Sequence, residues 1–265
     1  MNTKFWNATN LKIIACLLMF IDHIHEMFVG YGLVPHWLNI PGRLVFPIFL
    51  FLAADSFHYT HNRCTYMTRL FLASCLMLGL GSIITSIFPN DTVMVANNAF
   101  GTFFMTGLYI IAYDTIKDGI LERRASYILK GLGLAVLPIL SVLTLLLYKP
   151  IFKAFPFLIA RIIATFLSMI PNILAVEGGY FLVMMGLLFY VFRKNRFLQM
   201  LILLVFSVMA YYMDPSSYQW LMGLAIIPMW LYNGQKGSGH KYFFYIFYPV
   251  HIYGLYILAT LMMGR

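Results

Sequence analysis

Long apolar stretches, separated by short polar connections, are the feature that most constrains the fold of this chain. Ten such stretches approach the roughly 20 residues that an α-helix needs to cross the hydrocarbon core of a membrane. They are too continuously apolar for the strands of a β-barrel, which are about ten residues long and alternate in polarity. The stretches are Leu11–Val29, Gly42–Phe57, Leu70–Phe88, Phe100–Ile116, Ile128–Tyr148, Phe155–Leu174, Tyr180–Phe192, Phe197–Tyr212, Tyr218–Tyr232 and Phe243–Met263.

The composition favours burial in lipid over burial in water. Of the 265 residues, 62% are hydrophobic and 10% are charged, whereas about a quarter of the residues in a soluble domain are charged. In a bilayer every backbone polar group must be satisfied within the protein, and an α-helix achieves this inside each segment. The sequence therefore predicts an all-α, polytopic integral membrane helical bundle of about nine to ten transmembrane helices, built as a single domain over residues 1–265.

Lysine and arginine residues in the short loops indicate the orientation in the membrane. The second loop is flanked by Arg63 and Arg69, whereas the third loop, Asn90–Asn98, has no basic residue. Because basic loops tend to stay in the cytoplasm, this pattern predicts a multi-pass protein with a cytoplasmic N-terminus. The net charge of +9 is dispersed over helix ends, which favours contact with anionic membrane lipids and argues against a nucleic-acid partner.

The segment Phe155–Leu174 complicates this topology. It carries Arg161 in its middle and Pro171 near its end, and both residues are unfavourable in a plain spanning helix. If the segment crossed the membrane completely, the basic turn at residues 193–196 would lie outside the cell. We therefore expect about nine crossings and one re-entrant or tilted element at this position.

Ionisable residues inside the expected spans are the strongest indication of function, since each costs about 2.5–3.5 kcal/mol on insertion scales. Lys12 and His23 are eleven positions apart in the first span, so they share one helix face and lie about 16 Å apart along the axis. This spacing suits an elongated anionic donor, with its phosphates at Lys12 and its reactive end beside His23. Histidine is the natural general base at neutral pH.

A structural interpretation of the same residues stays open. A buried Asp–His pair is often an interhelical hydrogen bond, and Lys12 can extend its ammonium group to the membrane surface. Asp22 is adjacent to His23 in sequence, so the two side chains point about 100° apart on a helix. Asp22 is therefore expected to have its partner on another helix.

Basic residues around the second span form a further candidate site. Arg43 begins that span four residues before Pro47, which kinks a helix or frees a carbonyl group. His61, Arg63 and Arg69 form a basic cytoplasmic cluster. Functionally this cluster suits the phosphates of a nucleotide, because arginine makes bidentate contacts. The alternative is that it only anchors the topology.

The last span adds one more titratable residue, His251, two positions after Pro249. A titratable group just beyond a kink often lines a cavity, but a neutral histidine packed in a core gives the same pattern. The three cysteines are scattered and predict neither a disulfide framework nor a metal site. The remaining candidate site residues are Asp55, Glu26, His58 and Tyr248.

Three separate segments form one recognisable pattern. They are Leu11–Ala15 with Met19–Ile24, then Gly42–Phe49 followed by the stretch from Ala53 to Arg69, and finally Tyr245–His251. In this order the segments resemble the TraX family, named for the protein that acetylates the N-terminus of F-type pilin. The spacing from Lys12 to His23 is also similar to the Arg/Lys-X10-His motif of the wider transmembrane acyltransferases.

The resemblance implies an acetyltransferase in the bacterial plasma (inner) membrane. Such an enzyme takes acetyl from cytoplasmic acetyl-CoA and delivers it to an acceptor amine or hydroxyl at the extracytoplasmic side. The resemblance implies His23 as the catalytic histidine, with Lys12, Arg63 and Arg69 near the CoA phosphates. The acceptor stays open between a protein N-terminus, a glycan and a small amine.

Three further residues complete this hypothesis. Arg43 is the candidate hydrogen-bond donor for the oxyanion, and Asp22 or Glu26 is the candidate for holding a histidine tautomer. Asp55 departs from the family pattern, which has glutamate at this place. The rival hypothesis is a small-molecule or proton-coupled transporter that uses the same buried charges, but the paired halves typical of transporters are not found in the sequence.

Overall fold

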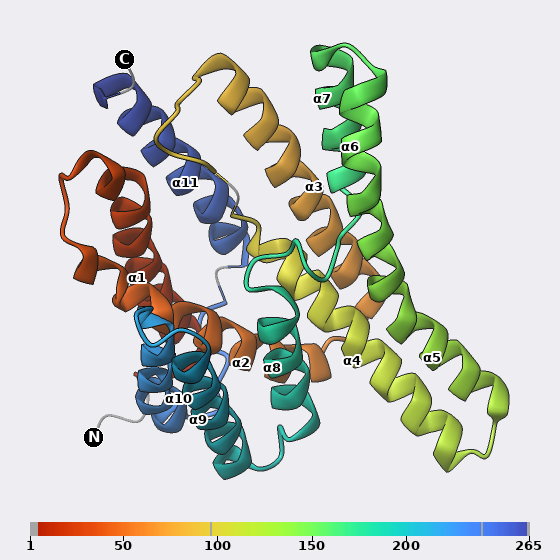
Figure 1. Cartoon of the computed structure of the whole chain (residues 1–265). Coiled ribbons are helices and arrows are strands. Elements are labelled where there is room, and N and C mark those ends of the chain that lie inside the picture. The colour runs from red at the N-terminus through yellow and green to blue at the C-terminus, as the bar shows by residue number, and fades with distance from the viewer. Residues whose placement is uncertain (1–4, 96, 240, 264–265) are drawn as a thin grey trace. The chain divides into compact units, whose positions relative to one another are not determined.

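A computed structural model describes residues 5–95, 97–239 and 241–263, and every regular element in this part of the chain is helical (Figure 1). Seven helical stretches are long and apolar enough to cross a membrane, and three shorter apolar helices accompany them among the described residues. Each of the ten apolar stretches in the sequence overlaps one of these helices. The predicted class, a helical membrane bundle, is confirmed.

The chain divides into two compact units. The first comprises Met1–His58, Ile83–Val95 and Leu188–Arg265, and the second comprises Tyr59–Ser82 and Ala96–Leu187. Two helices, α3 (Arg63–Ile87) and α8 (Gly179–Val191), run from the second unit into the first. The other elements of the first unit are α1 (Ala8–Phe28), three 3₁₀ helices (Val29–Tyr31, His36–Asn39 and Pro41–Leu44), α2 (Val45–His58), α9 (Arg196–Met213), the 3₁₀ helix Tyr218–Ala225, α10 (Ile226–Leu231) and α11 (Lys241–Met263).

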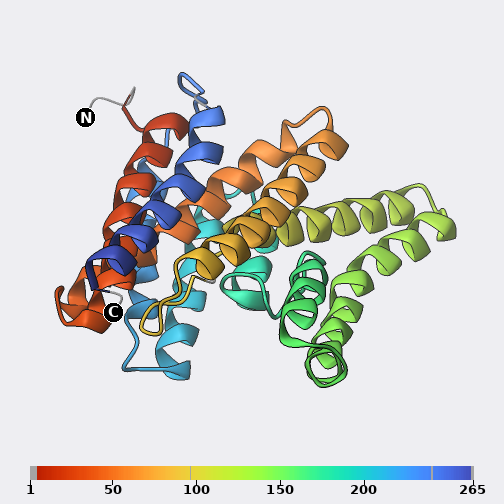
Figure 2. The same ribbon diagram turned by 90° about the horizontal axis from the view of Figure 1, so that it is seen from above.

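The N-terminus of α1 is fixed beside the segment that leads into α11. Asn7 caps α1 by accepting a hydrogen bond from the backbone N–H of Asn10, which satisfies one of the first N–H groups of the helix. The N–H of Ala8 donates to the carbonyl of Gln235 at 2.8 Å, and the Thr9 hydroxyl donates to the carbonyl of Lys236 at 2.9 Å. As a result α1 and α11 run side by side, as the red and blue ribbons of Figure 2 show.

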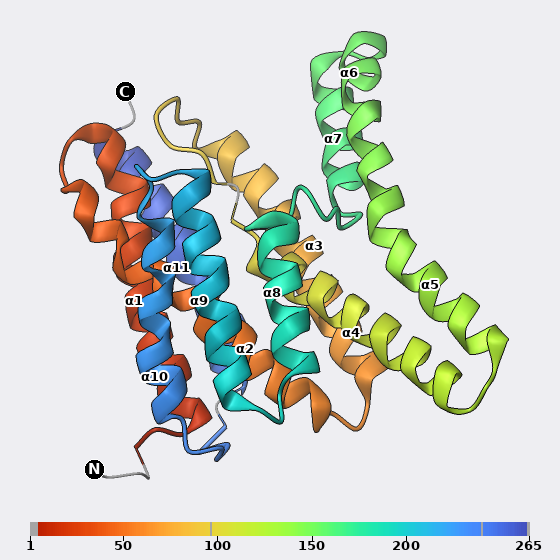
Figure 3. The same cartoon turned by 60° about the horizontal axis from the view of Figure 1, so that its bottom comes forward.

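The 3₁₀ helix Pro41–Leu44 leads directly into α2 and brings a glycine against α1. Pro47 falls in the first turn of α2, where a missing N–H costs little because that group has no partner within the helix. A Cβ atom on Gly42 would overlap the Asp22 carboxyl group, so this close approach requires glycine. Figure 3 shows α9 and α10 next to each other within the same unit.

In the second unit α4 and α5 form an antiparallel pair (Figure 1). Gly131 lies at their contact, and a Cβ atom there would be 2.9 Å from the carbonyl oxygen of Ala112. Glycine therefore allows the two backbones to approach closely, as small residues do between membrane helices. The elements of this unit that follow α3 are α4 (Ala99–Leu121), α5 (Ala125–Leu140), the 3₁₀ helix Ser141–Thr144, α6 (Leu145–Ala154) and α7 (Phe157–Ser168).

The segment expected to be re-entrant or tilted forms the short helix α7. Its 12 residues span about 18 Å, which is less than the roughly 30 Å of the hydrocarbon core. Arg161 turns inward and donates a hydrogen bond to the carbonyl of Ser82 at 3.0 Å. The Ser82 hydroxyl is also 3.1 Å from that of Thr165. The charge in this segment thus lies against polar groups of α3 within the second unit.

The outward-facing side chains are largely apolar. Leu129 and Leu146 are each 69% exposed, and Phe157 is 71% exposed. Exposed apolar surface of this extent is unfavourable in water and ordinary for a protein whose solvent is lipid. The chain is therefore a multi-pass membrane protein, and its polar side chains are most informative where they lie inside it.

Candidate functional site

A buried pair of histidines lies between α1 and α11. The Nδ1 atom of His23 is 2.7 Å from the Nε2 atom of His251, and the two residues are 3% and 6% exposed. The other ring nitrogen of His251, Nδ1, is 2.6 Å from the carbonyl oxygen of Phe247, one turn earlier in α11. His251, one of the open candidates in the sequence, is therefore the direct partner of His23.

The second ring nitrogen of His23 faces a carboxylate. Its Nε2 atom lies 3.6 Å from Oε2 of Glu26, which is three residues further along α1, and the Glu26 side chain is 37% exposed. The Tyr248 ring packs edge-on near both imidazoles, with centroid distances of 6.4 Å to His23 and 5.9 Å to His251. Glu26, Tyr248 and His251 thus join His23 in one cluster, which we call the histidine cluster.

Lys12 lies on the same side of α1 as His23. Its ammonium group is 5.7 Å from the ring centroid of Phe244, and Phe244 and His251 both belong to α11. Lys12 and His23 therefore both face α11, as their eleven-residue spacing in α1 requires. The arrangement places a cation near the N-terminal ends of α1 and α11, and the imidazole pair further along both helices.

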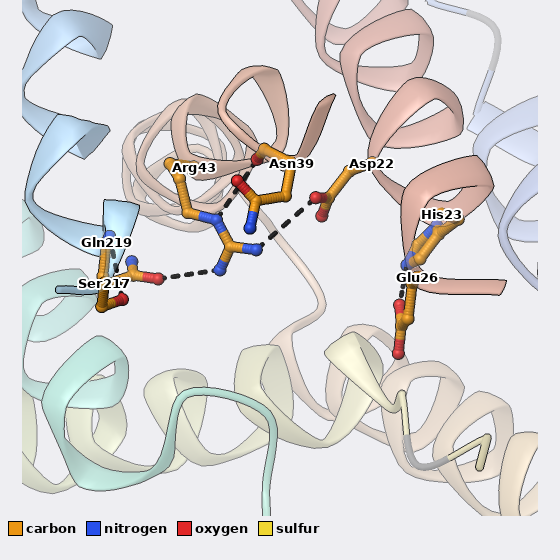
Figure 4. A network of polar contacts seen from close by, with 7 residues as sticks. All are labelled: Asp22, His23, Glu26, Asn39, Arg43, Ser217 and Gln219. Carbon is orange, nitrogen blue, oxygen red and sulfur yellow. Dashed lines mark hydrogen bonds and ion pairs between the residues drawn. The ribbon is translucent and has the colours of Figure 1, made fainter. Parts of the chain in front are cut away.

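Asp22 points to a different set of partners. Figure 4 shows Arg43 between Asp22 and Gln219, while His23 and Glu26 lie on another side of α1. The Arg43 guanidinium is 3.5 Å from the Asp22 carboxylate and donates to the Gln219 side chain at 3.1 Å and to the Asn39 carbonyl at 3.3 Å. The expectation that Asp22 has its partner on another helix is thus met, and that partner is Arg43.

Asp55 belongs to a third group within the first unit. The Tyr232 hydroxyl donates to its carboxylate at 3.3 Å, and the backbone carbonyl of Tyr232 accepts a hydrogen bond from Arg196. This group joins α2 to the N-terminal turn of α9 and the end of α10. The structure therefore places Asp55 in a contact between helices, and its partner is not one of the partners of His23.

The basic residues at the end of α2 and just after it have different contacts. Arg63 forms an ion pair with Asp114 of α4 at 2.7 Å, inside the second unit. Arg69 is exposed, and His61 is exposed with its Nδ1 atom 3.2 Å from the carbonyl of Tyr59. His58, also exposed, closes α2 near the Tyr190 ring. Arg63 thus anchors α3 to α4, and its positive charge is partly compensated by Asp114.

Sequence reasoning did not identify Gln219, which joins Arg43 to the 3₁₀ helix Tyr218–Ala225. Its only sequence signal is a lone amide in an apolar stretch. Asp114, the partner of Arg63, was also missed, because a single acidic residue near the end of an apolar stretch has no distinctive spacing. Among the described residues no group of three or more His, Cys, Asp or Glu could hold a metal ion.

Comparison with known proteins places the chain in a family. The sequence model of the family described as "TraX protein" matches residues 7–259 of this chain. The chain belongs to the TraX family. Within this TraX chain, the matched region contains all the candidate site residues, from Lys12 to His251.

A curated relative supports the same relationship. The chain is 28% identical over 259 residues to "Probable fimbrial assembly protein FimC, serogroup H1" of Dichelobacter nodosus, and the match covers 93% of each chain. No solved structure matches the chain. Family membership therefore rests on sequence along nearly the whole length, and the arrangement of the histidine cluster comes from the structure alone.

Proposed function

We propose that this TraX chain is a membrane-embedded acetyltransferase. It moves an acetyl group from cytoplasmic acetyl-CoA to an acceptor amine or hydroxyl at the extracytoplasmic side of the bacterial plasma membrane, with its N-terminus in the cytoplasm. The observation that carries the proposal is the surroundings of His23. One ring nitrogen is hydrogen-bonded to a second buried imidazole and the other faces a carboxylate, on the helix face that also carries Lys12.

The reaction needs a base for the acceptor and an acid for the leaving thiol. In the proposed step the acceptor nitrogen or oxygen attacks the thioester carbonyl carbon, and His23 takes the proton that the acceptor loses. The carbon–sulfur bond then breaks, and His23 returns the proton to the departing CoA thiolate. The imidazole ends the cycle as it began, which suits a residue whose ordinary pKa lies near neutrality.

The charged candidates take supporting roles in this proposal. Lys12 binds the CoA phosphates at the cytoplasmic ends of α1 and α11. Arg63, Arg69 and His61 stay phosphate-binding candidates on the grounds of the sequence alone. Arg43, the oxyanion donor expected from the sequence, contacts Asp22, Asn39 and Gln219 on another side of α1 from His23. We therefore assign it no step at the thioester.

The second substrate of the proposed reaction is the molecule that accepts the acetyl group. The name of the D. nodosus relative refers to fimbrial assembly, which favours an acceptor among the subunits of such an assembly. Glu26 is more exposed than His23, so it is suited to meet an incoming amine or hydroxyl before its proton reaches the imidazole. We therefore propose that the acceptor approaches the histidine cluster along the Glu26 side.

The test is acetyl transfer from labelled acetyl-CoA by the purified chain. His23→Ala should lower the rate by about 100-fold or more, because general-base catalysis contributes roughly 10²–10⁴-fold. His36→Ala is the matched control, since His36 is exposed, and it should keep the wild-type rate. Full activity of His23→Ala would exclude this histidine as the base.

The transporter hypothesis makes a different prediction for ligand binding. If the chain is an acetyltransferase, CoA should raise the Tm of the detergent-solubilised protein by mass action. Small ions and metabolites without a CoA moiety should have no such effect. Stabilisation by a small ion but not by CoA would favour transport.

A further inference from the structure

The hydrogen bonds of His251 determine where its own proton lies. Its Nδ1 atom is 2.6 Å from the carbonyl oxygen of Phe247, and a carbonyl oxygen can only accept a hydrogen bond. Nδ1 of His251 therefore carries a hydrogen atom and donates it. The ring is also stacked on Phe247 with a centroid distance of 4.4 Å and an interplanar angle of 19°, which restrains its orientation.

The proton on His251 in turn determines the tautomer of His23. A neutral imidazole has one N–H group, so Nε2 of His251 carries a lone pair and accepts. Charging this ring would place a cation in a site that is 6% exposed and next to a second imidazole, which is costly. Because the contact between the two rings is 2.7 Å, Nδ1 of His23 must supply the hydrogen.

We infer that His251 is a positioning residue that holds His23 in the Nδ1–H tautomer, so that Nε2 of His23 accepts the proton of the substrate. This inference rests on the proposed function and deepens it. The lone pair on Nε2 lies 3.6 Å from the Glu26 carboxylate. Both groups can accept a hydrogen bond, and in the proposed reaction the N–H or O–H group of the substrate donates to Nε2 of His23.

The proton balance of the transfer is consistent with this arrangement. When Nε2 of His23 takes the substrate proton, the ring becomes an imidazolium that still donates from Nδ1 to His251. His251 keeps its own hydrogen on Nδ1 throughout and accepts no proton. It therefore acts only through His23, by setting the tautomer and stabilising the imidazolium with a charge-assisted hydrogen bond.

The tautomer can be read directly by NMR on protein with isotope-labelled histidine, without any substrate. The ring nitrogens of His23, assigned by the loss of their signals in His23→Gln, should show a protonated Nδ1 and an unprotonated Nε2. In His251→Phe, which keeps the ring shape but removes both nitrogens, this preference should be lost. An Nε2–H tautomer of His23 in the wild-type protein would overturn the inference.

Kinetics separate a positioning role from a structural one. His251→Phe should lower kcat roughly 10- to 100-fold, within the range of general-base effects, and leave the KM for acetyl-CoA unchanged. His251→Gln places a carbonyl oxygen near the former Nε2 and can accept from His23, so it should recover most of the lost kcat. Equal losses in the two variants would show that the acceptor atom does not matter and would overturn the inference.

The two readouts also separate this inference from the proposed function. If no acetyl transfer occurs but the tautomer preference is present and disappears in His251→Phe, the proposed function fails and the positioning role stands. If transfer requires His23 but kcat and tautomer are unchanged in His251→Phe, the positioning role fails and the proposed function stands.

Discussion

Two adjacent residues of α1, Asp22 and His23, face two different surroundings. His23 and its partner His251 are 3% and 6% exposed and form a buried pair with their ring nitrogens 2.7 Å apart. The side chains of Asp22 and Arg43 are 21% and 29% exposed and form an ion pair. The difference teaches that one turn of helix carries both a buried imidazole, our proposed proton-transfer group, and a partly exposed ion pair that holds neighbouring elements together.

The physical reason lies in what each environment tolerates. A buried imidazole can stay neutral and still bind a proton during a reaction, whereas a buried unpaired charge costs several kcal/mol. The Asp22–Arg43 pair keeps partial access to solvent and gains further hydrogen bonds from Gln219 and Asn39. We therefore expect substitutions on the Asp22 side to change stability, and substitutions on the His23 side to change kinetics.

The largest expected effect on stability is at Asp22. Asp22→Ala removes the charge partner of Arg43 and should cost about 1.5–3 kcal/mol, the range for hydrogen bonds to charged groups. The measurement is thermal unfolding in detergent. Asp22→Asn is the matched control, because it keeps the shape that Gly42 packs against and keeps an oxygen acceptor for Arg43.

Activity of the Asp22→Asn variant tests the comparison itself. The rate of acetyl transfer should stay within about threefold of the wild type, against the loss of 100-fold or more expected for His23→Ala. A loss of kcat in Asp22→Asn as large as in His23→Ala would break the distinction between the two sides of α1.

An intermediate effect is expected at Lys12, which lies on the His23 side. Lys12→Ala should raise the KM for acetyl-CoA about tenfold with kcat little changed, as for the loss of a contact made equally in the ground and transition states. Steady-state kinetics over a range of acetyl-CoA concentrations measure both constants. Lys149→Ala, at an exposed position in the second unit, is the control. An unchanged KM in Lys12→Ala would exclude the phosphate role.

The smallest expected effect is at Gln219, which supports Arg43 from the 3₁₀ helix Tyr218–Ala225. Gln219→Ala removes one hydrogen bond to a half-buried guanidinium and should cost about 0.5–1.5 kcal/mol. Thermal unfolding should show a smaller decrease in Tm than for Asp22→Ala. A larger decrease would mean that Gln219, and not Asp22, is the main partner of Arg43.

Local features of the fold could be predicted because they depend on short stretches of sequence. The ten apolar stretches predicted the helices, and the eleven-residue spacing placed Lys12 and His23 on one face of α1. The 100° offset between neighbours predicted that Asp22 would turn away from His23. The bounds expected for the stretch Phe155–Leu174 were less accurate, since α7 covers only Phe157–Ser168. A proline near its end and an internal arginine do not by themselves determine where a helix stops.

The partners of the candidate residues could not be predicted. Asp22 or Glu26, through a neighbouring helix, was the candidate for holding a histidine tautomer, and the residue found in contact with Nδ1 of His23 is His251, 228 positions away. Asp55 has Tyr232 as its partner, and Arg63 has Asp114. In each case the partner belongs to another helix, and no periodicity within one segment contains that information.

The sequence by itself determined that this chain is a helical membrane protein of the TraX type with titratable groups inside its first span. It did so because lipid requires long apolar helices and makes each buried charge costly enough to be informative. Only the tertiary structure decided which of these groups meet. The packing of α11 along α1 brings two imidazoles within hydrogen-bond distance, and that contact depends on how helices pack, which local sequence patterns do not specify.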